Sequence, residues 1–170
     1  MCIRDSFFGD NDFNHANFEG ANLQNAIIRG DVGGASFVDA NLSGANLTGC
    51  GSFDDVNFTN SNLTNTILQT APIFRNSSLE RANLGNIDAS AGEFFNVFMQ
   101  GVNLQHADLE AAEFSGNTIL INANLSGADL TDAVLRNIDL QDADLTSANL
   151  SGADLRAVSY THLRAHETSL

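Results

Sequence analysis

The sequence predicts an all-β solenoid, a rod of stacked coils, and three observations lead to that class. A five-residue period runs without a gap through residues 123–157, which read ANLSG ADLTD AVLRN IDLQD ADLTS ANLSG ADLRA. A large apolar residue returns at every fifth position, whereas a helix spaces such residues by three and four and a strand by two. Similar residues also recur at every fourth unit. A fixed period is typical of solenoids, in which each unit buries its apolar side against its neighbours.

The five-residue units share one pattern. A small or β-branched residue comes first, the second residue is usually Asn or Asp, the third is Leu or Phe, and the last two are mostly polar. The ANL and ADL units resemble the pentapeptide-repeat family. This resemblance implies a right-handed quadrilateral β-helix with four units to a coil. The central Leu or Phe and the small residue two places earlier would point inward. Leu is large enough to fill such an interior and Ala is small enough for a crowded wall, while the other three positions face water.

Both ends of the chain resemble translated sequencing-adapter sequence. Residues 1–5 can be encoded as ATG TGT ATA AGA GAC, and the reverse complement of that DNA translates as Val-Ser-Tyr-Thr-His, which stands at residues 158–162. We therefore expect residues 1–6 and 157–170 to be adapter-derived. Residues 7–156 then form one pentapeptide-repeat β-helix domain, open at both ends. Exposed core and unpaired backbone at such ends favour end-to-end self-association.

The chain is acidic, with 21 Asp and Glu residues against seven Lys and Arg, and its formal net charge is −14. Leaving out Arg4, Arg164, Asp5 and Glu167 leaves five Arg and 19 acids, so the charge stays −14. There is no Lys, and no apolar run is long enough to span a membrane. Between the two ends the only cysteine is Cys50, which cannot form a disulfide framework.

The large apolar centre of each unit can be followed from the start of the chain. A glycine cluster at residues 30–34 shortens the spacing by one and predicts a bulge or tight bend, with Gly33 counted as the centre of a weak unit. A one-residue slip follows at residues 50–52. The other centres in this half are Phe8, Phe13, Phe18, Leu23, Ile28, Phe37, Leu42, Leu47, Phe53, Phe58, Leu63 and Leu68.

A second slip lies at residues 71–74 and contains Pro72, whose missing N–H costs less there than inside a ladder. Either Ile73 or Phe74 can be the centre, and Phe74 is chosen because the centres one coil away are also Phe. A final slip leaves Ile119 or Leu120 as the centre. The other centres are Leu79, Leu84, Ala89, Phe94, Met99, Leu104, Leu109, Phe114 and every fifth residue from Leu125 to Leu155.

Every fourth centre carries a similar residue, which predicts a four-sided coil. There are 29 centres from Phe13 to Leu155, so we expect about seven coils. At ~4.8 Å per coil the rod is roughly 34 Å long. The predicted columns are Leu23, Leu42, Leu63, Leu84, Leu104, Leu125 and Leu145 on one side, Phe13, Gly33, Phe53, Phe74, Phe94 and Phe114 on another, and Phe18, Phe37 and Phe58 on a third.

We expect no enzymatic activity and no bound cofactor or metal. His15 and His106 occupy outward positions about four coils apart on different sides, so surface solvation accounts for both. Cys50 lies at the first slip, where a small half-buried filler fits better than a nucleophile. Asp54 and Asp55 are adjacent, but a core packed with Leu and Phe leaves no cavity for a reaction.

The predicted function is a non-enzymatic acidic scaffold for protein–protein interaction, and DNA mimicry is the alternative. The family resemblance implies the alternative, because some pentapeptide-repeat proteins are acidic rods that occupy the DNA-binding saddle of gyrase. Carboxylates would replace DNA phosphates toward gyrase or another DNA-binding protein, and the chain itself would bind no nucleic acid. Against this, acidity also serves solubility, and such a rod matches only about ten base pairs. The candidate acids form two outward columns, Asp88, Asp108 and Asp129 in one, and Glu93, Glu113 and Asp154 in the other.

Phe95 and Phe98 form the predicted contact site of the scaffold. Both occupy positions that elsewhere carry polar residues, and with Val97 inward between them the rings straddle one corner of a coil. Fully burying a Phe is worth about 1.5–3 kcal/mol, so exposed rings are costly unless a protein partner or a second copy covers them. Arg75 and Ser115 are expected on the rim. The alternative is that one ring folds over the slip near residues 73–76.

Overall fold

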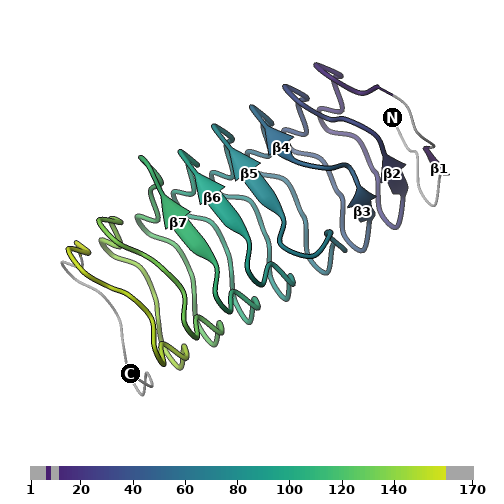
Figure 1. Cartoon of the computed structure of the whole chain (residues 1–170). Coiled ribbons are helices and arrows are strands. Elements are labelled where there is room, and N and C mark those ends of the chain that lie inside the picture. Colours follow the sequence, from purple (N-terminus) through teal and green to yellow (C-terminus); the bar gives the residue numbers. More distant parts are fainter. Residues whose placement is uncertain (1–6, 9–11, 160–170) are drawn as a thin grey trace.

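The computed structural model describes residues 7–8 and 12–159, which wind into a rod of stacked coils (Figure 1). No α-helix occurs in these residues, and the strands in them pair in parallel. The chain is therefore the all-β repeat solenoid that the five-residue period predicts. None of the described residues lies in a helix that could cross a membrane.

Seven short strands lie on two sides of the rod (Figure 1). One sheet has the order β1-β2-β3 and the other the order β4-β5-β6-β7, so each strand pairs with the strand one coil further along. The strands are short because the chain turns a corner after almost every fifth residue. Their bounds are Phe7–Phe8 (β1), Ile27–Arg29 (β2), Asn46–Gly49 (β3), Phe53–Asp54 (β4), Ile73–Arg75 (β5), Glu93–Phe95 (β6) and Glu113–Ser115 (β7).

Four ladders of parallel pairs run along the rod, one on each face, which confirms the four-sided coil. The pairs join residues about 20 positions apart, as between Ser78 and Phe98. We name the faces A to D in chain order. Face A carries Asn17, Ser36, Asn57, Ser78, Phe98, Ile119, Asp139 and Ser159; face B carries Asn22, Asn41, Asn62, Asn83, Asn103, Asn124 and Asp144; face C carries β1 to β3, Ile67, Asp88, Asp108, Asp129 and Asn149; face D carries β4 to β7, Val134 and Asp154.

The face A ladder has seven steps between Asn17 and Ser159, which agrees with about seven coils. Ser159 lies three residues beyond the predicted end of the domain, and its backbone still pairs with that of Asp139. Backbone pairing does not depend on side-chain identity, so the proposed adapter origin of residues 157–170 stays a prediction. Residues 1–6 and 160–170 lie outside the described residues.

The leucine column fills the interior behind face B. Each of its members is exposed by 1% or less, and Leu104 is completely buried. Two columns of phenylalanine fill the interior behind faces A and D. Within each column the rings stack with centroids 4.7–5.2 Å apart, close to the spacing of strands in a sheet. The stacked rings are Phe18, Phe37 and Phe58 behind face A, and Phe53, Phe74, Phe94 and Phe114 behind face D.

The weak unit at the glycine cluster is centred on Val32, and the prediction of Gly33 is wrong. Val32 is 1% exposed, and its carbonyl accepts the N–H of Ala35 at 3.0 Å, as central residues do at other corners. Gly33 faces outward, where an added Cβ would lie 2.9 Å from the Asn14 side chain. The physical reason is burial, because Val gains free energy inside the rod and Gly has no side chain to bury.

The later slips follow the same rule of burial. Phe74 is 1% exposed while Ile73 lies half-buried on the outside, which confirms the choice of Phe74. At the last slip Leu120 is completely buried, so Leu120 is the centre and Ile119 faces outward.

Face C has a break in its ladder between Ile67 and Asp88. Each of these residues pairs with the coil on its other side, but no described backbone hydrogen bond joins them to each other. The amide of Leu68, which would bridge the gap, has no acceptor among the described residues. The break adjoins the slip that contains Pro72, and it leaves Ile67 53% exposed.

Where an Asn or Asp precedes the central residue, it shapes the corner that follows. Its side-chain oxygen accepts a hydrogen bond from the backbone N–H two residues on, as in Asn41 with Ser43 at 3.1 Å and Asp129 with Thr131 at 2.9 Å. The next residue has a positive φ, for example 67° at Gly44. Gly, Asn and Asp tolerate that region best, which explains why polar residues recur in the motif.

Candidate protein-contact site

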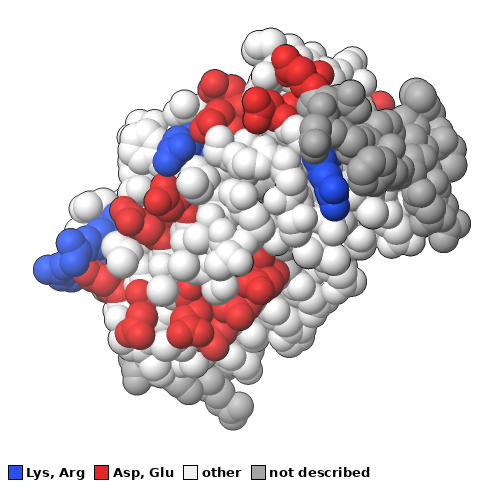
Figure 2. All heavy atoms as spheres, turned by 45° about the vertical axis from the view of Figure 1, so that its right-hand side comes forward, with Lys and Arg blue, Asp and Glu red and all other residues white. Residues whose placement is uncertain are grey.

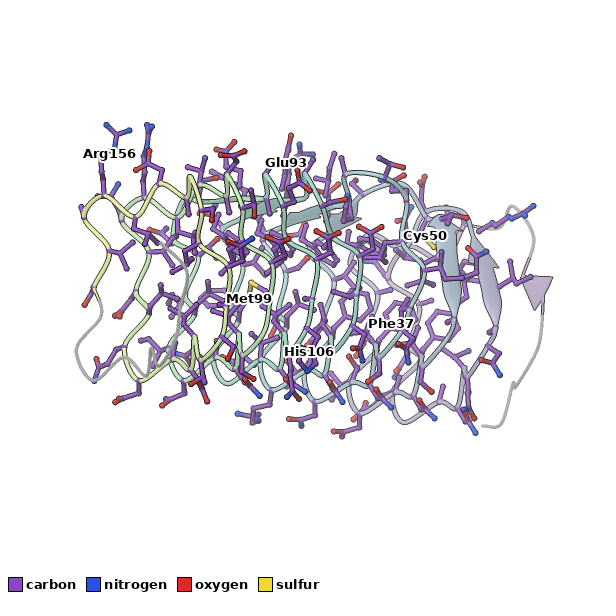
Figure 3. The ribbon with its side chains drawn as sticks, turned by 90° about the horizontal axis from the view of Figure 1, so that it is seen from below. Phe37, Cys50, Glu93, Met99, His106 and Arg156 are labelled. Atoms are coloured by element: carbon purple, nitrogen blue, oxygen red, sulfur yellow. The ribbon has the colours of Figure 1, made fainter. Side chains whose placement is uncertain are left out.

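The two histidines lie at corners in different stacks and do not meet. A Cβ added at Gly34 would lie 2.3 Å from the His15 ring, and one at Gly127 would lie 2.4 Å from the His106 ring, so each ring covers a glycine of the next coil. Figure 3 shows His106 on the opposite side of the rod from Glu93. No three His, Cys, Asp or Glu residues in the described part of the chain come together in a way that could hold a metal ion.

Cys50 is more deeply buried than the half-buried filler that the sequence predicts. It is 1% exposed, and its thiol donates to the carbonyl of Ile28 at 3.3 Å. Burial, with a smaller contribution from the charge of Asp31, raises the pKa of the Cys50 thiol to about 12. A thiol in that state is a poor nucleophile, since the thiolate is the reactive form.

The adjacent acids Asp54 and Asp55 face outward. Asp54 accepts a hydrogen bond from the Ser52 hydroxyl, and both residues line a surface hollow of about 360 Å³ together with Asn14, Asp31 and Gly33. Asp55 takes no part in that lining and occupies the next corner, with a positive φ of 57°.

Phe95 and Phe98 lie on adjacent faces and straddle one corner. Phe95 ends β6 on face D and is 44% exposed, while Phe98 on face A is 48% exposed. Val97 between them is completely buried. The Phe95 ring leans toward the next coil, because an added Cβ at Gly116 would lie 3.1 Å from its Cε2 atom. Both rings therefore face solvent from a backbone held on either side by ladder pairs.

A surface hollow of about 520 Å³ lies beside Phe95 on face D. Arg75 and Ser115, the residues expected on the rim, are the in-register neighbours of Phe95 in β5 and β7. Glu93 and Glu113 complete the lining. The hollow thus joins one aromatic ring, one hydroxyl, one arginine and two carboxylates.

An ion pair fills one side of this hollow. The Arg75 guanidinium donates to the Glu93 carboxylate of the following coil at 3.1 Å. Three coils further along the rod, Arg136 donates to Asp154, which is again the acid of the following coil. The neighbouring Arg156 guanidinium, and then Arg136, hold the pKa of the Asp154 carboxyl well below its usual range.

The acids of each predicted column lie along one ladder, although Val134 separates Glu113 from Asp154 on face D. Asp88, Asp108 and Asp129 stand in register on face C, and Glu93 and Glu113 stand in register on face D. Figure 2 shows two groups of acidic side chains separated by an uncharged strip, with a few arginines among or beside them. On face C the acids also serve the corners. Asp88 accepts from the Ser90 hydroxyl at 2.8 Å, and the Thr131 hydroxyl lowers the pKa of Asp129.

Comparison with protein families decides what kind of chain this is. The model for pentapeptide repeats matches residues 3–30, 31–71, 99–137 and 123–159, in eight copies. These segments span more than half of the sequence. The chain belongs to the pentapeptide-repeat family. A sequence search of curated proteins finds no match.

Several solved structures resemble this pentapeptide-repeat protein. HetL, a pentapeptide-repeat protein involved in the regulation of heterocyst differentiation in the cyanobacterium Nostoc sp. strain PCC 7120, is 25% identical, with 93% of this chain and 78% of HetL covered and a TM-score of 0.32. A pentapeptide-repeat protein from the thylakoid lumen of Arabidopsis thaliana is 30% identical, with coverages of 79% and 71% and a TM-score of 0.28. QnrB1, a plasmid-mediated fluoroquinolone resistance protein, is 18% identical, with coverages of 98% and 90% and a TM-score of 0.48.

Sequence reasoning missed two features of this pentapeptide-repeat protein. Ile67 is a third exposed apolar side chain, and its position before the central Leu68 was a signal, because that position is usually Asn or Asp. Glu93 and Glu113 were assigned only to a phosphate-like column, yet they line the hollow beside Phe95. The signal was the predicted stacking itself, which puts these acids one coil from Arg75 and Phe95.

Proposed function

We propose that this pentapeptide-repeat protein is a non-enzymatic scaffold that binds another protein through the corner formed by Phe95 and Phe98. The main support for this proposal is that the rings of Phe95 and Phe98 are 44% and 48% exposed on a surface that is otherwise mostly polar. Aromatic residues presented on a rigid surface are typical anchors of protein interfaces. A partner that covers them would remove an apolar area whose exposure costs free energy.

A different protein suits this corner better than a second copy of the chain. The net charge of −14 makes two copies repel one another, and the hollow beside Phe95 is itself lined by two carboxylates. A basic partner would instead be attracted. The ring of Phe95 leans toward Gly116, away from Arg75, which supports the proposal over the alternative that residues 73–76 cover it.

The test compares Phe95→Ser/Phe98→Ser with Ile67→Ser, which removes a similarly exposed apolar side chain from face C. Proteins captured by the wild-type chain are identified, purified and titrated against each variant. We expect both variants to fold, and only the Phe95/Phe98 variant to lose at least about tenfold in affinity, as expected for an interface anchor. A loss of thermal stability in the Phe95/Phe98 variant with unchanged partner affinity of its folded state would assign the rings a structural role. Light scattering of the wild type alone detects self-association, which would replace the partner by a second copy.

The absence of enzymatic activity belongs to the same proposal. The arrangement supports it, because Cys50 is buried with a raised pKa and the two histidines stand in separate stacks. The hollows lined by acids lie on the surface and not in the core.

DNA mimicry is the second candidate, and the in-register acids of face C favour it. Asp88, Asp108 and Asp129 repeat along the rod as phosphate charges repeat along a DNA strand. Face D supports mimicry less, because arginines pair with two of its three candidate acids. A DNA gyrase supercoiling assay at low ionic strength tests this function, since mimicry requires salt-sensitive competition with DNA. Unchanged supercoiling at saturating protein would remove the candidate.

A further inference from the structure

We infer that the hollow beside Phe95 binds an arginine side chain of the partner protein, with Glu113 as its counter-ion and the Phe95 ring as its platform. This inference rests on the proposed scaffold function and names the chemistry of the partner. It follows from a relationship between arginines and acids that repeats along face D.

On face D two arginines that follow a central residue pair with the acid before the central residue of the next coil, whereas Arg156 pairs with Asp154 of its own coil. Arg75 pairs with Glu93 in this way, and Arg136 pairs with Asp154. Phe95 stands in register with Arg75, one coil further along. The acid that an arginine at the position of Phe95 would pair with is Glu113, which is in register with Glu93.

Glu113 therefore lacks the arginine that this relationship gives to its neighbours. Its carboxylate takes part in no ion pair or hydrogen bond among the described residues. The position that would supply the arginine holds Phe95 instead. Since the sequence contains no Lys and its nearby Arg75 is already paired, a cation for Glu113 has to come from outside.

The shape and chemistry of the hollow favour a guanidinium over an ammonium group. A guanidinium is planar and stacks on an aromatic face, while its N–H groups form a fork that matches a carboxylate. The hollow of about 520 Å³ offers the Phe95 ring, the Glu113 carboxylate and the Ser115 hydroxyl around one space. The Arg75–Glu93 pair in its lining demonstrates that this face accommodates a guanidinium beside a carboxylate.

The probe is N-acetyl-arginine methylamide, titrated at constant ionic strength into the whole chain carrying 13C in its Phe rings and Glu side chains. We expect saturable NMR shifts at the Phe95 ring and the Glu113 carboxyl group. The citrulline analogue keeps the shape of arginine without its charge, and we expect it to bind about tenfold more weakly. Shifts that are equal for both probes, or that do not saturate, would overturn the inference.

Matched variants locate the site. Glu113→Gln should weaken binding of the arginine probe about tenfold, whereas Glu110→Gln removes an exposed acid of face C that has no part in the hollow and should leave binding unchanged. Phe95→Arg restores the repeating pair within the chain. It should shift the Glu113 carboxyl signal and abolish binding of the probe. Equal losses in Glu113→Gln and Glu110→Gln would show general attraction of cations and overturn the inference.

The two proposals can fail separately. If Phe95→Ser/Phe98→Ser loses the partner but the arginine probe does not bind, the scaffold function stands and the arginine site is wrong. If the probe binds saturably and the same variant keeps full affinity for the partner, the hollow binds arginine, but the contact corner and the assignment of that arginine to this partner are both wrong.

Discussion

Ile87 and Ala89 carry the two inward side chains of face C in the reverse order of size from the neighbouring coil. In that coil the small residue comes first, as Ala107, and the large central residue follows, as Leu109. Ile87 is 1% exposed and Ala89 is completely buried, so both point inward. The exchange conserves the buried volume of the coil, which is why the interior stays filled although the central residue is only Ala.

This relationship predicts a compensating pair of substitutions. Ala89→Leu alone overpacks the coil and should cost about 1–3 kcal/mol, and Ile87→Ala alone leaves a cavity and should cost about 2–5 kcal/mol. The double variant restores the common order and should be more stable than the sum of the single effects implies. Urea unfolding of all four proteins measures the coupling. Strictly additive losses would mean that the two side chains do not share one space.

The period of the sequence predicted the interior of the rod, because one rule of burial applies in every coil. Phe74 could be chosen over Ile73 since stacking demands similar residues one coil apart. The assignment of Gly33 as the centre of its unit is wrong, because it follows the regular spacing of centres and gives no weight to the burial of Val32. Only the folded chain shows which of the two residues turns inward. The break beside Leu68 depends on the path of the backbone through a slip, which no side-chain pattern records.

The contact corner was predictable only in part. That Phe95 is exposed follows from its place after a central residue, and Arg75 and Ser115 follow from the stacking of coils. That Glu113 lacks an arginine can be recognised only from the structure, which shows that Arg75 and Arg136 each reach the acid of the next coil. Either direction along the rod is compatible with the sequence alone.

Leu104→Asp should unfold the coils around it. Leu104 is completely buried in the leucine column, and a carboxylate there would be charged without a partner. We expect a loss above about 4 kcal/mol in unfolding free energy, measured by thermal or urea denaturation. Gln105→Asp places the same charge on the adjacent exposed residue and should leave stability nearly unchanged. An unaltered melting curve for Leu104→Asp would contradict the inward assignment.

Cys50 should resist alkylation until the rod unfolds. Its pKa of about 12 leaves almost no thiolate near neutral pH, and its side chain is buried. The experiment uses a Cys2→Ser background, so that only Cys50 can react with iodoacetamide. We expect modification in urea and almost none in native buffer, followed by mass spectrometry. Comparable rates in the two conditions would show that the first slip opens readily.

Asp154 should make the C-terminal coils sensitive to acid. Its folded-state pKa is lowered by Arg156 and Arg136, so its stabilising contribution is present above the ordinary pKa of about 4 and is lost as the pH falls through the lowered value. Asp154→Asn should therefore reduce the urea midpoint most at neutral pH, with the difference from wild type shrinking in acid. Asp108→Asn, at a residue outside the described ion pairs, is the control. A difference that is independent of pH would contradict the ionic origin.

Hydrogen exchange should find the weakest part of face C at the break beside Leu68. The amides of Leu47 and Leu109, at the equivalent place in other coils, donate across the ladder at 2.8 Å, whereas the Leu68 amide has no acceptor among the described residues. An amide without a hydrogen bond exchanges without global unfolding, while ladder amides wait for larger openings. We expect Leu68 to exchange at least about tenfold faster than Leu47 and Leu109 in native buffer, measured by NMR, and the three rates to converge in urea as global unfolding takes over. Equal protection of the three amides in native buffer would mean that the ladder closes across this face in solution.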